Sequence, residues 1–206
     1  IVGLGFFDPL FREGLQVSIW APPASSPLWR RLGRYLSPPL FPVHVRELGC
    51  DLQLHEGMDG PVRCGEFTVE AAPIDHPGFA VGYRIGHAGG QLACLAVQEP
   101  ALCPEVPRVA SGTSGYGGRG DVGVLIRDGQ YSPEEYDEHV GWGHSSTLHA
   151  VALAEMAGAG TLALFHHDPA HHDEAVERLA TEAAGAATNV SVMAARQGQT
   201  FLLGAD

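Results

Sequence analysis

The chain has 206 residues, enough for one domain with a sizeable core; 45% of them are hydrophobic and 17% are charged. This balance excludes an intrinsically disordered chain, and no apolar run reaches the roughly 18 residues that a membrane span requires. The 24 acidic residues outnumber the 12 basic ones, all of them Arg, which gives a net charge of −12. Such a charge argues against a protein that holds nucleic acid mainly by neutralising its phosphates.

The four cysteines form no Cys-x-x-Cys pair, and a domain of this length does not need disulfide bonds. We therefore expect a reducing, cytoplasmic environment. The chain opens on an apolar run at residues 1–7, with neither Met nor a signal segment at its start. This opening leads us to expect that further sequence precedes residue 1.

The order of expected elements changes along the chain. The first forty residues are rich in proline, which we interpret as a connecting region with one short helix at 28–36. Strand-type runs dominate after residue 45 and alternate with helices in the second half, which predicts an α/β protein with mixed sheets. The expected strands are 49–54, 66–72, 81–85, 91–96, 122–126, 161–165 and 190–194, and the later helices are 133–138, 145–157 and 173–184.

A glycine-rich segment at 111–120 separates the two halves. It contains neither the phosphate-binding pattern G-x-x-x-x-G-K-[ST] nor a G-x-G-x-x-G run before a helix, and the chain has no Lys. We therefore interpret this segment as a flexible loop.

The eleven histidines include several at the ends of expected strands. His76 follows one strand, His144 precedes a helix, and His166 with His167 follows another strand. Polar side chains at strand ends are where α/β sheets place ligands and catalytic groups. Neutral imidazole is a common zinc ligand, and a nearby carboxylate fixes its tautomer. The adjacent carboxylates are Asp75, Asp128 and Asp168.

Each of these histidines also has a structural interpretation. His76 precedes a proline and could serve only a turn, and residues 166–168 could begin a helix with Asp168 or Asp173 as its N-cap. We expect Trp142 to be buried against the sheet rather than to cover a substrate. His171 and His172 are expected to be exposed in the first turn of a helix. The histidines expected to be structural are His44, His55, His87, His139 and His149.

Taken in order, four segments resemble a known superfamily. They are 76–78 (His-Pro-Gly), 125–131, 141–145 (Gly-Trp-Gly-His-Ser) and 164–169 (Leu-Phe-His-His-Asp-Pro). Together they resemble the metallo-β-lactamase-fold hydrolases, in the phosphodiesterase-like branch related to the tRNA 3′-processing endonucleases. The resemblance covers nearly the whole chain. It implies a four-layer αββα sandwich that lacks its first strands, formed by residues 1–206 as a single domain that is two-thirds or more of the usual one.

The resemblance also implies roles for individual residues. His76 and His166 match metal-binding positions in a site for two divalent ions, which activate a water for attack on a phosphodiester. His144 matches a histidine that acts as general acid or stabilises the pentavalent phosphorus, and Asp128 matches the acidic residue that orients it. Zinc, manganese and iron all suit such ligands. The residues expected to surround these groups are His167, Asp168 and Ser145, with the choice of ligand between His166 and His167 left open.

Three departures from the family pattern stand out. The H-x-H-x-D-H signature is absent, because residues 1–7 resemble the segment that directly follows it. Val97 aligns with the aspartate that bridges both metals, and Glu99, two positions later, could offer its carboxylate from a slipped turn. Arg127 stands where related sequences often carry His, and in a metal-free pocket it could bind an anion directly.

Two functions therefore stand as hypotheses. The first is a metal-dependent hydrolase of phosphodiesters, with a small molecule favoured over nucleic acid as its substrate and no membrane partner. The second is a degenerate member that serves as a binding or interaction module. The chain itself supplies about one metal ligand per ion, and a catalytic zinc needs about three. We therefore expect the isolated chain to be inactive and, through exposed sheet edges, homo-oligomeric or poorly soluble.

Overall fold

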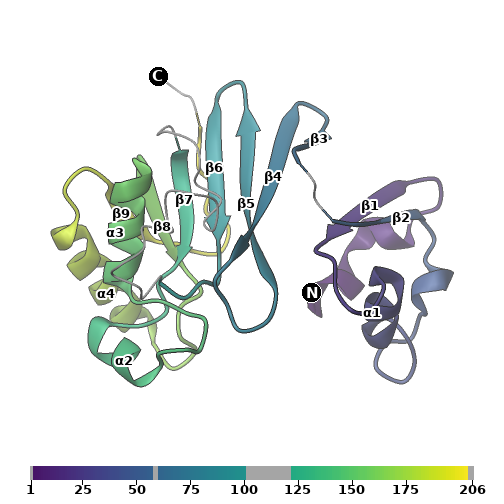
Figure 1. Cartoon of the computed structure of the whole chain (residues 1–206), viewed down its shortest axis with the longest axis horizontal. Coiled ribbons are helices and arrows are strands. Elements are labelled where there is room, and N and C mark those ends of the chain that lie inside the picture. Colours follow the sequence, from purple (N-terminus) through teal and green to yellow (C-terminus); the bar gives the residue numbers. More distant parts are fainter. Residues whose placement is uncertain (1, 58–59, 101–121, 204–206) are drawn as a thin grey trace. The chain divides into compact units, whose positions relative to one another are not determined.

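The computed structural model describes residues 2–57, 60–100 and 122–203. The expected glycine-rich loop at 111–120 lies outside the described residues. The chain divides into two compact units, Ile1–Asp59 and Gly60–Asp206, and Figure 1 shows the elements of each. No helix in the described part of the chain has the length and apolarity to cross a bilayer.

The first unit is a small α/β assembly. Its parallel strands β1 (Gln16–Ala21) and β2 (Asp51–Glu56) pair in register from Gln16 opposite Asp51. Helix α1 (Leu28–Tyr35) packs on β2 through leucines at helical spacing, of which Leu32 is 1% exposed. Three short 3-10 helices complete the unit: η1 (Val2–Phe6), η2 (Asp8–Phe11) and η3 (Val45–Glu47).

The second unit is built on a seven-stranded mixed sheet in the order β3-β4-β5-β6-β7-β8-β9. Strands β3 to β6 pair antiparallel, and β6 to β9 pair parallel. The strands are β3 (Val62–Cys64), β4 (Phe67–Ile74), β5 (Ala80–His87), β6 (Gly90–Leu95), β7 (Val122–Asp128), β8 (Thr161–Phe165) and β9 (Ser191–Ala194).

Three helices belong to this unit: α2 (Pro133–Glu138), α3 (Thr147–Ala157) and α4 (Asp173–Ala186). Helix α3 packs on β7 and β8, α4 packs on β9, and the two helices contact each other, so they cover the same face of the sheet (Figure 1). Ala150 and Ala154 of α3 are fully buried, and their small side chains let the helix approach the strands closely. The core between the layers includes the buried Leu125, Leu162 and Leu164.

The structure confirms the α/β class and the strands and helices expected after residue 66, with shifts of a few residues at their ends. It adds β1 and β3, which the sequence analysis did not predict. Strand β1 ends just before the proline pair at 22–23 and finds its partner β2 about 35 residues away. Such a strand is stabilised by a distant partner that local periodicity cannot reveal.

The last turn of α3 is tied to the loop before β9 by Glu155. Its carboxylate accepts hydrogen bonds from the backbone N–H of Thr188 (2.6 Å) and of Asn189 (2.8 Å). The Asn189 and Thr188 amides hold the pKa of Glu155 below its usual value. Gly158 then ends the helix with a left-handed φ of 62°.

We expect Glu155→Gln to lower the melting temperature at neutral pH. Because the folded state depresses this pKa, the carboxylate stabilises the fold above its unfolded pKa, and this contribution is lost as the pH falls through the folded value. Thermal unfolding from pH 7 to pH 3 should therefore show the two proteins converging. Glu182→Gln is the control, since this exposed carboxylate of α4 takes part only in a solvent-exposed ion pair with Arg178 at 3.8 Å, and it should change the curve little. An equal gap at every pH would contradict the carboxylate explanation.

Candidate active site

The ends of three strands bring predicted site residues to one edge of the sheet. Strand β4 runs antiparallel to β5, and β5 runs antiparallel to β6, so β4, β6, β7 and β8 all point the same way. His76 lies two residues after β4, Asp128 is the last residue of β7, and His166 directly follows β8. His76, Asp128 and His166 therefore lie at the same edge of the sheet.

Asp128 is the buried anchor of this edge, with no exposed surface. Its Oδ2 lies 2.8 Å from Nδ1 of His144. Its Oδ1 accepts the backbone N–H of Gln130 (3.1 Å) and of Ser145 (3.2 Å), and the Ser145 hydroxyl donates to the Asp128 carbonyl oxygen. This arrangement fixes the His144 ring by one nitrogen and leaves Nε2 as the nitrogen available for chemistry.

Three imidazoles gather at this anchor. The His144 ring stacks on His166 with centroids 4.9 Å apart, and it meets His76 edge-on at 6.0 Å. His166 has a left-handed φ of 58°, a conformation that costs energy outside glycine and often marks a functional site. Burial lowers the pKa of His166, and the neighbouring histidines lower it further, whereas Asp128 raises it. These histidines are His76, His144 and His167. The lowered pKa favours the neutral ring, which is the form that binds metals.

Asp128, His144 and His166 also form a group that could hold a cation. One ligand atom from each lies within 4.8 Å of the others. It is the only such group of three or more His, Cys, Asp or Glu side chains among the described residues. Two imidazoles and a carboxylate are a donor set suited to zinc, manganese or iron. Since both Asp128 oxygens already accept hydrogen bonds, we interpret that carboxylate as the group that orients His144. His76, whose ring centroid lies 6.0 Å from that of His144, is not in this group of three.

A second hydrogen-bond network, centred on Gln130, joins Asp168 to Tyr131; of these residues, the sequence predicted only Asp168 to lie near the site. Nε2 of Gln130 donates to Asp168 (3.1 Å) and to the Tyr131 hydroxyl (3.1 Å). The backbone N–H of Ala170 and the Gln130 amide hold the pKa of Asp168 below its usual value, so this carboxylate is ionised. Gln130 follows Asp128 by two residues, and only its buried position in the structure distinguishes it from an ordinary turn glutamine.

Known proteins share this architecture. No family model matches the chain. Ribonuclease Z of Mycobacterium marinum is 30% identical to it over 125 residues, which are 58% of this chain and 42% of that protein. The solved structure of YhfI of Bacillus subtilis, a metallo-β-lactamase fold protein, covers 89% of the chain with a TM-score of 0.62 at 18% identity. The chain has the metallo-β-lactamase fold.

Two further solved structures agree with this fold. Human tRNase Z, short form, matches 82% of the chain with a TM-score of 0.58 at 17% identity, and a diphosphatase from the PhnP family matches 92% with a TM-score of 0.57 at 16% identity. The chain covers 64%, 66% and 60% of YhfI, the human protein and the diphosphatase. It thus spans less than two thirds of each of these three proteins, and 42% of the ribonuclease.

The metallo-β-lactamase fold places Val97 and Glu99 after β6, at the same edge as the histidines. Val97 packs against the hydrophobic core. The Glu99 carboxylate, 8% exposed, turns toward the backbone before α3 and is not in the group of candidate metal ligands. The structure therefore gives no support to a slipped-turn metal ligand at Glu99.

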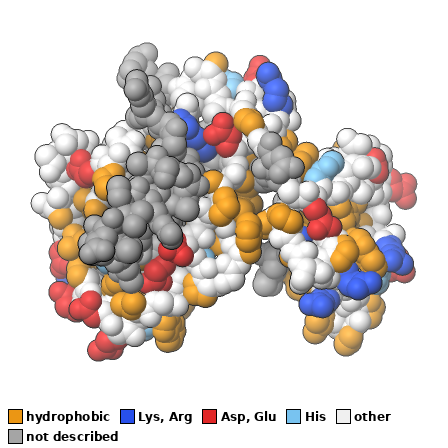
Figure 2. All heavy atoms as spheres, in the orientation of Figure 1, with side chains coloured by type: hydrophobic (Ala, Val, Ile, Leu, Met, Phe, Trp, Pro, Cys, Tyr) orange, Lys and Arg blue, Asp and Glu red, His pale blue; other side chains and the backbone are white. Residues whose placement is uncertain are grey.

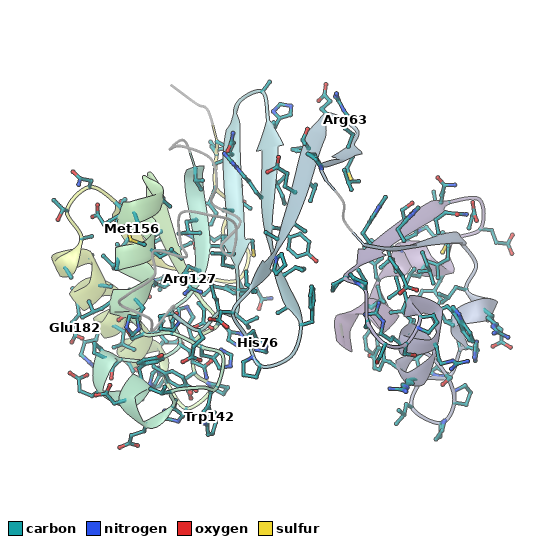
Figure 3. All side chains as sticks on the ribbon, viewed as in Figure 1. Arg63, His76, Arg127, Trp142, Met156 and Glu182 are labelled. Carbon is teal, nitrogen blue, oxygen red and sulfur yellow. The ribbon has the colours of Figure 1, made fainter. Side chains whose placement is uncertain are left out.

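Arg127 and Trp142 differ from their expected roles. Arg127 is 1% exposed and donates to the Gln98 carbonyl oxygen, so it does not open toward a solvent-borne anion. It shares a face of β7 with Leu125, under the helices. The expected burial of Trp142 is wrong: it is 63% exposed on the loop that carries His144, and its ring contacts only the edge of His139 among the described aromatic pairs. Figure 3 shows Trp142 pointing away from the sheet, whereas His76 lies closer to the strands.

The histidines outside the site have partners elsewhere in their own units. His171 corrects one expectation, because its side chain is 13% exposed and its Nε2 lies 2.8 Å from Glu135. The N-cap of α4 is His172, which accepts the Ala175 N–H, rather than Asp168 or Asp173. The remaining contacts are His44 capping η3, His55 stacked on Trp20, His87 near Phe67, His139 stacked on Tyr131, and His149 bonded to Ser146.

Proposed function

We propose that the chain carries part of the active site of a metal-dependent hydrolase that cleaves phosphodiesters. One observation carries this proposal: a fully buried carboxylate, Asp128, holds Nδ1 of His144 at 2.8 Å while the ring lies against His166 and His76. A carboxylate–histidine pair at the carboxyl ends of parallel strands is a common arrangement for a proton-transfer group.

The metal ligands in this proposal are His76 and His166, with His167, Asp168 and Ser145 around them. When bound, zinc, manganese or iron would supply positive charge to the phosphate oxygens and activate the attacking water. The pattern of the fold family implies two ions, and further ligands would come from sequence outside this chain. Neutral His166 and the Asp128–His144 pair are this chain's own contribution.

His144 is the proposed general acid. The attacking water loses one proton to solvent as its oxygen bonds to phosphorus. The bond to the leaving oxygen breaks, and Nε2 of His144 donates a proton to that oxygen. Because Oδ2 of Asp128 contacts Nδ1 of His144, the Nε2 atom of His144 points away from the Asp128 carboxylate. The stacked ring of His166 restricts rotation of His144 about its side-chain bonds.

A small phosphodiester is the substrate class that the charge favours. The relatives include a ribonuclease and a diphosphatase, so RNA and small phosphate compounds are both candidates. Helix α2, which leads into the His144 loop, carries Glu134, Glu135, Asp137 and Glu138, and Figure 2 shows acidic side chains gathered in that part of the second unit. Because these carboxylates repel a long polyanion more than a short one, a small molecule is preferred.

A binding module without hydrolytic activity is the second candidate. Val97 favours it, because a side chain packed into the core cannot bridge two ions. The buried Asp128–His144 pair would then serve only to orient the loop before α3.

Native mass spectrometry of the protein isolated from its native source tests the proposal, together with hydrolysis of bis(4-nitrophenyl) phosphate. We expect bound metal and metal-dependent hydrolysis, both lost in His166→Ala. His172→Ala, at an exposed capping histidine, is the control and should keep both. A 21.8 kDa chain with neither metal nor hydrolysis would refute the hydrolase and favour the binding module.

A further inference from the structure

The Glu99 carboxylate collects three hydrogen bonds from the segment between α2 and α3. Its Oε1 accepts the Tyr136 hydroxyl (2.6 Å) and the Gly141 backbone N–H (3.0 Å), and its Oε2 accepts the Gly143 backbone N–H (2.6 Å). These partners lie 37 to 44 residues away in the chain. One side chain thus fixes the turn that ends at His144.

The backbone of Glu99 ties the same point to a second loop. Its N–H donates to the Asp75 carbonyl oxygen at 2.8 Å, directly before His76. The two loops also touch, since a Cβ on Gly143 would lie 2.5 Å from the His76 ring. Glu99 therefore joins the segments that carry His76 and His144.

The charge on Glu99 strengthens this link. Burial raises the pKa of Glu99, but the hydrogen bonds from Gly141, Tyr136 and Gly143, with the nearby His144, outweigh burial and hold that pKa below its usual value. Burial and the adjacent Glu99 raise the pKa of Tyr136, so its hydroxyl remains a donor. Hydrogen bonds to an ionised carboxylate are roughly twice as strong as neutral ones.

We propose that Glu99 is a positioning residue that fixes the His144 ring beside His76 by holding the 141–143 turn, an inference that rests on the proposed role of His144. Its two carboxylate oxygens are both occupied by donors from that turn and from α2, so it acts through His144 and not on the substrate. Positioning matters to rate because a displacement of about 1 Å can cost about 100-fold in turnover.

Nuclear magnetic resonance of Glu99→Gln in the 206-residue chain tests this proposal without requiring activity. Gln keeps the shape but offers one acceptor oxygen, so one of the two glycine N–H groups loses its partner. We expect shifted amide resonances for Gly141 and Gly143, and weakening or loss of the hydrogen-bonded Nδ1 proton signal of His144. Where the native protein hydrolyses a diester, kcat should fall by about 10- to 100-fold with KM little changed.

Two further variants keep the result decisive. Glu155→Gln removes a carboxylate with a similar set of backbone partners at the far end of α3, and it should leave the His144 signals unchanged. Tyr136→Phe removes a single donor and should shift the Gly141 amide even if Glu99→Gln does not fold. Unchanged Gly141, Gly143 and His144 signals in a folded Glu99→Gln protein would overturn the proposal. Shifted signals in a protein without hydrolysis would support the positioning and refute only the proposed function.

Discussion

Asp128→Asn is expected to leave the chain folded while moving the ring proton of His144 from Nδ1 to Nε2. The backbone N–H groups of Gln130 and Ser145 both donate to Oδ1, so the amide oxygen of Asn must take that place. Its NH₂ group then faces Nδ1 of His144, where Oδ2 lies at 2.8 Å. Two donors cannot share that contact, and the ring must present a lone pair at Nδ1.

The consequence for the proposed reaction is large. A charged His144 would place its Nδ1–H against the amide hydrogens, so proton donation and recovery at Nε2 are both impaired. We expect kcat to fall by about 10²- to 10⁴-fold, the range for loss of a general acid or base. The free energy of unfolding should change by only about 1–3 kcal/mol, the range for one charged hydrogen bond.

Two measurements check this expectation. Nitrogen chemical shifts of the His144 ring report its tautomer, and urea unfolding reports stability. Asp173→Asn is the matched control, because it makes the same chemical change at an exposed aspartate. Asp173 lies in the first turn of α4, far from His144 in the sequence. An unchanged His144 tautomer in Asp128→Asn would show that the carboxylate does not set the ring.

Gly143→Ala is expected to be the more damaging of two similar substitutions. Gly143 has a φ of 89°, and an added Cβ would lie 2.5 Å from both the His76 ring and Pro77. Left-handed backbone costs a residue with a side chain about 1–2 kcal/mol. Overpacking adds a cost of about 1–3 kcal/mol. We therefore expect the free energy of unfolding to fall by about 2–5 kcal/mol in total, and His76 to be displaced.

Gly141→Ala separates backbone strain from the clash. Gly141 has the same φ of 89°, but a Cβ there meets nothing within 4 Å. In this variant the free energy of unfolding should fall only by the cost of backbone strain, about 1–2 kcal/mol, and the His76 resonances should not move. Urea unfolding and the His76 ring signals of both variants provide the comparison. Equal losses, with His76 unmoved in both, would contradict the close packing of the turn on His76.

The predictable part of the fold was the part with strong local patterns. Strand β7 is a continuous apolar run, and α3 follows a serine cap, Ser146, so both were expected near their observed bounds. Strand β1 was missed because its partner β2 comes 35 residues later. Short strands with distant partners depend on tertiary pairing more than on local propensity.

The misassigned side chains share a physical reason. Trp142 was expected to be buried against the sheet, His171 was expected to be exposed in the first turn of a helix, and Arg127 was considered for anion binding in a metal-free pocket. The surroundings of His171 and Arg127 come from elements distant in the chain, because Glu135 binds His171 and the Gln98 carbonyl oxygen accepts from Arg127. Residue type sets a preference for burial, whereas neighbouring elements decide it.

The sequence by itself determined which residues could carry the chemistry. His76, Asp128, His144 and His166 stand at strand ends or before a helix, and parallel strands bring such ends to a common edge. Only the tertiary structure decided how they act together, through the bond from Asp128 to His144 and the stacking on His166. It also decided that Glu99 holds a turn, because hydrogen bonds between residues more than 40 positions apart depend on packing that no local pattern encodes.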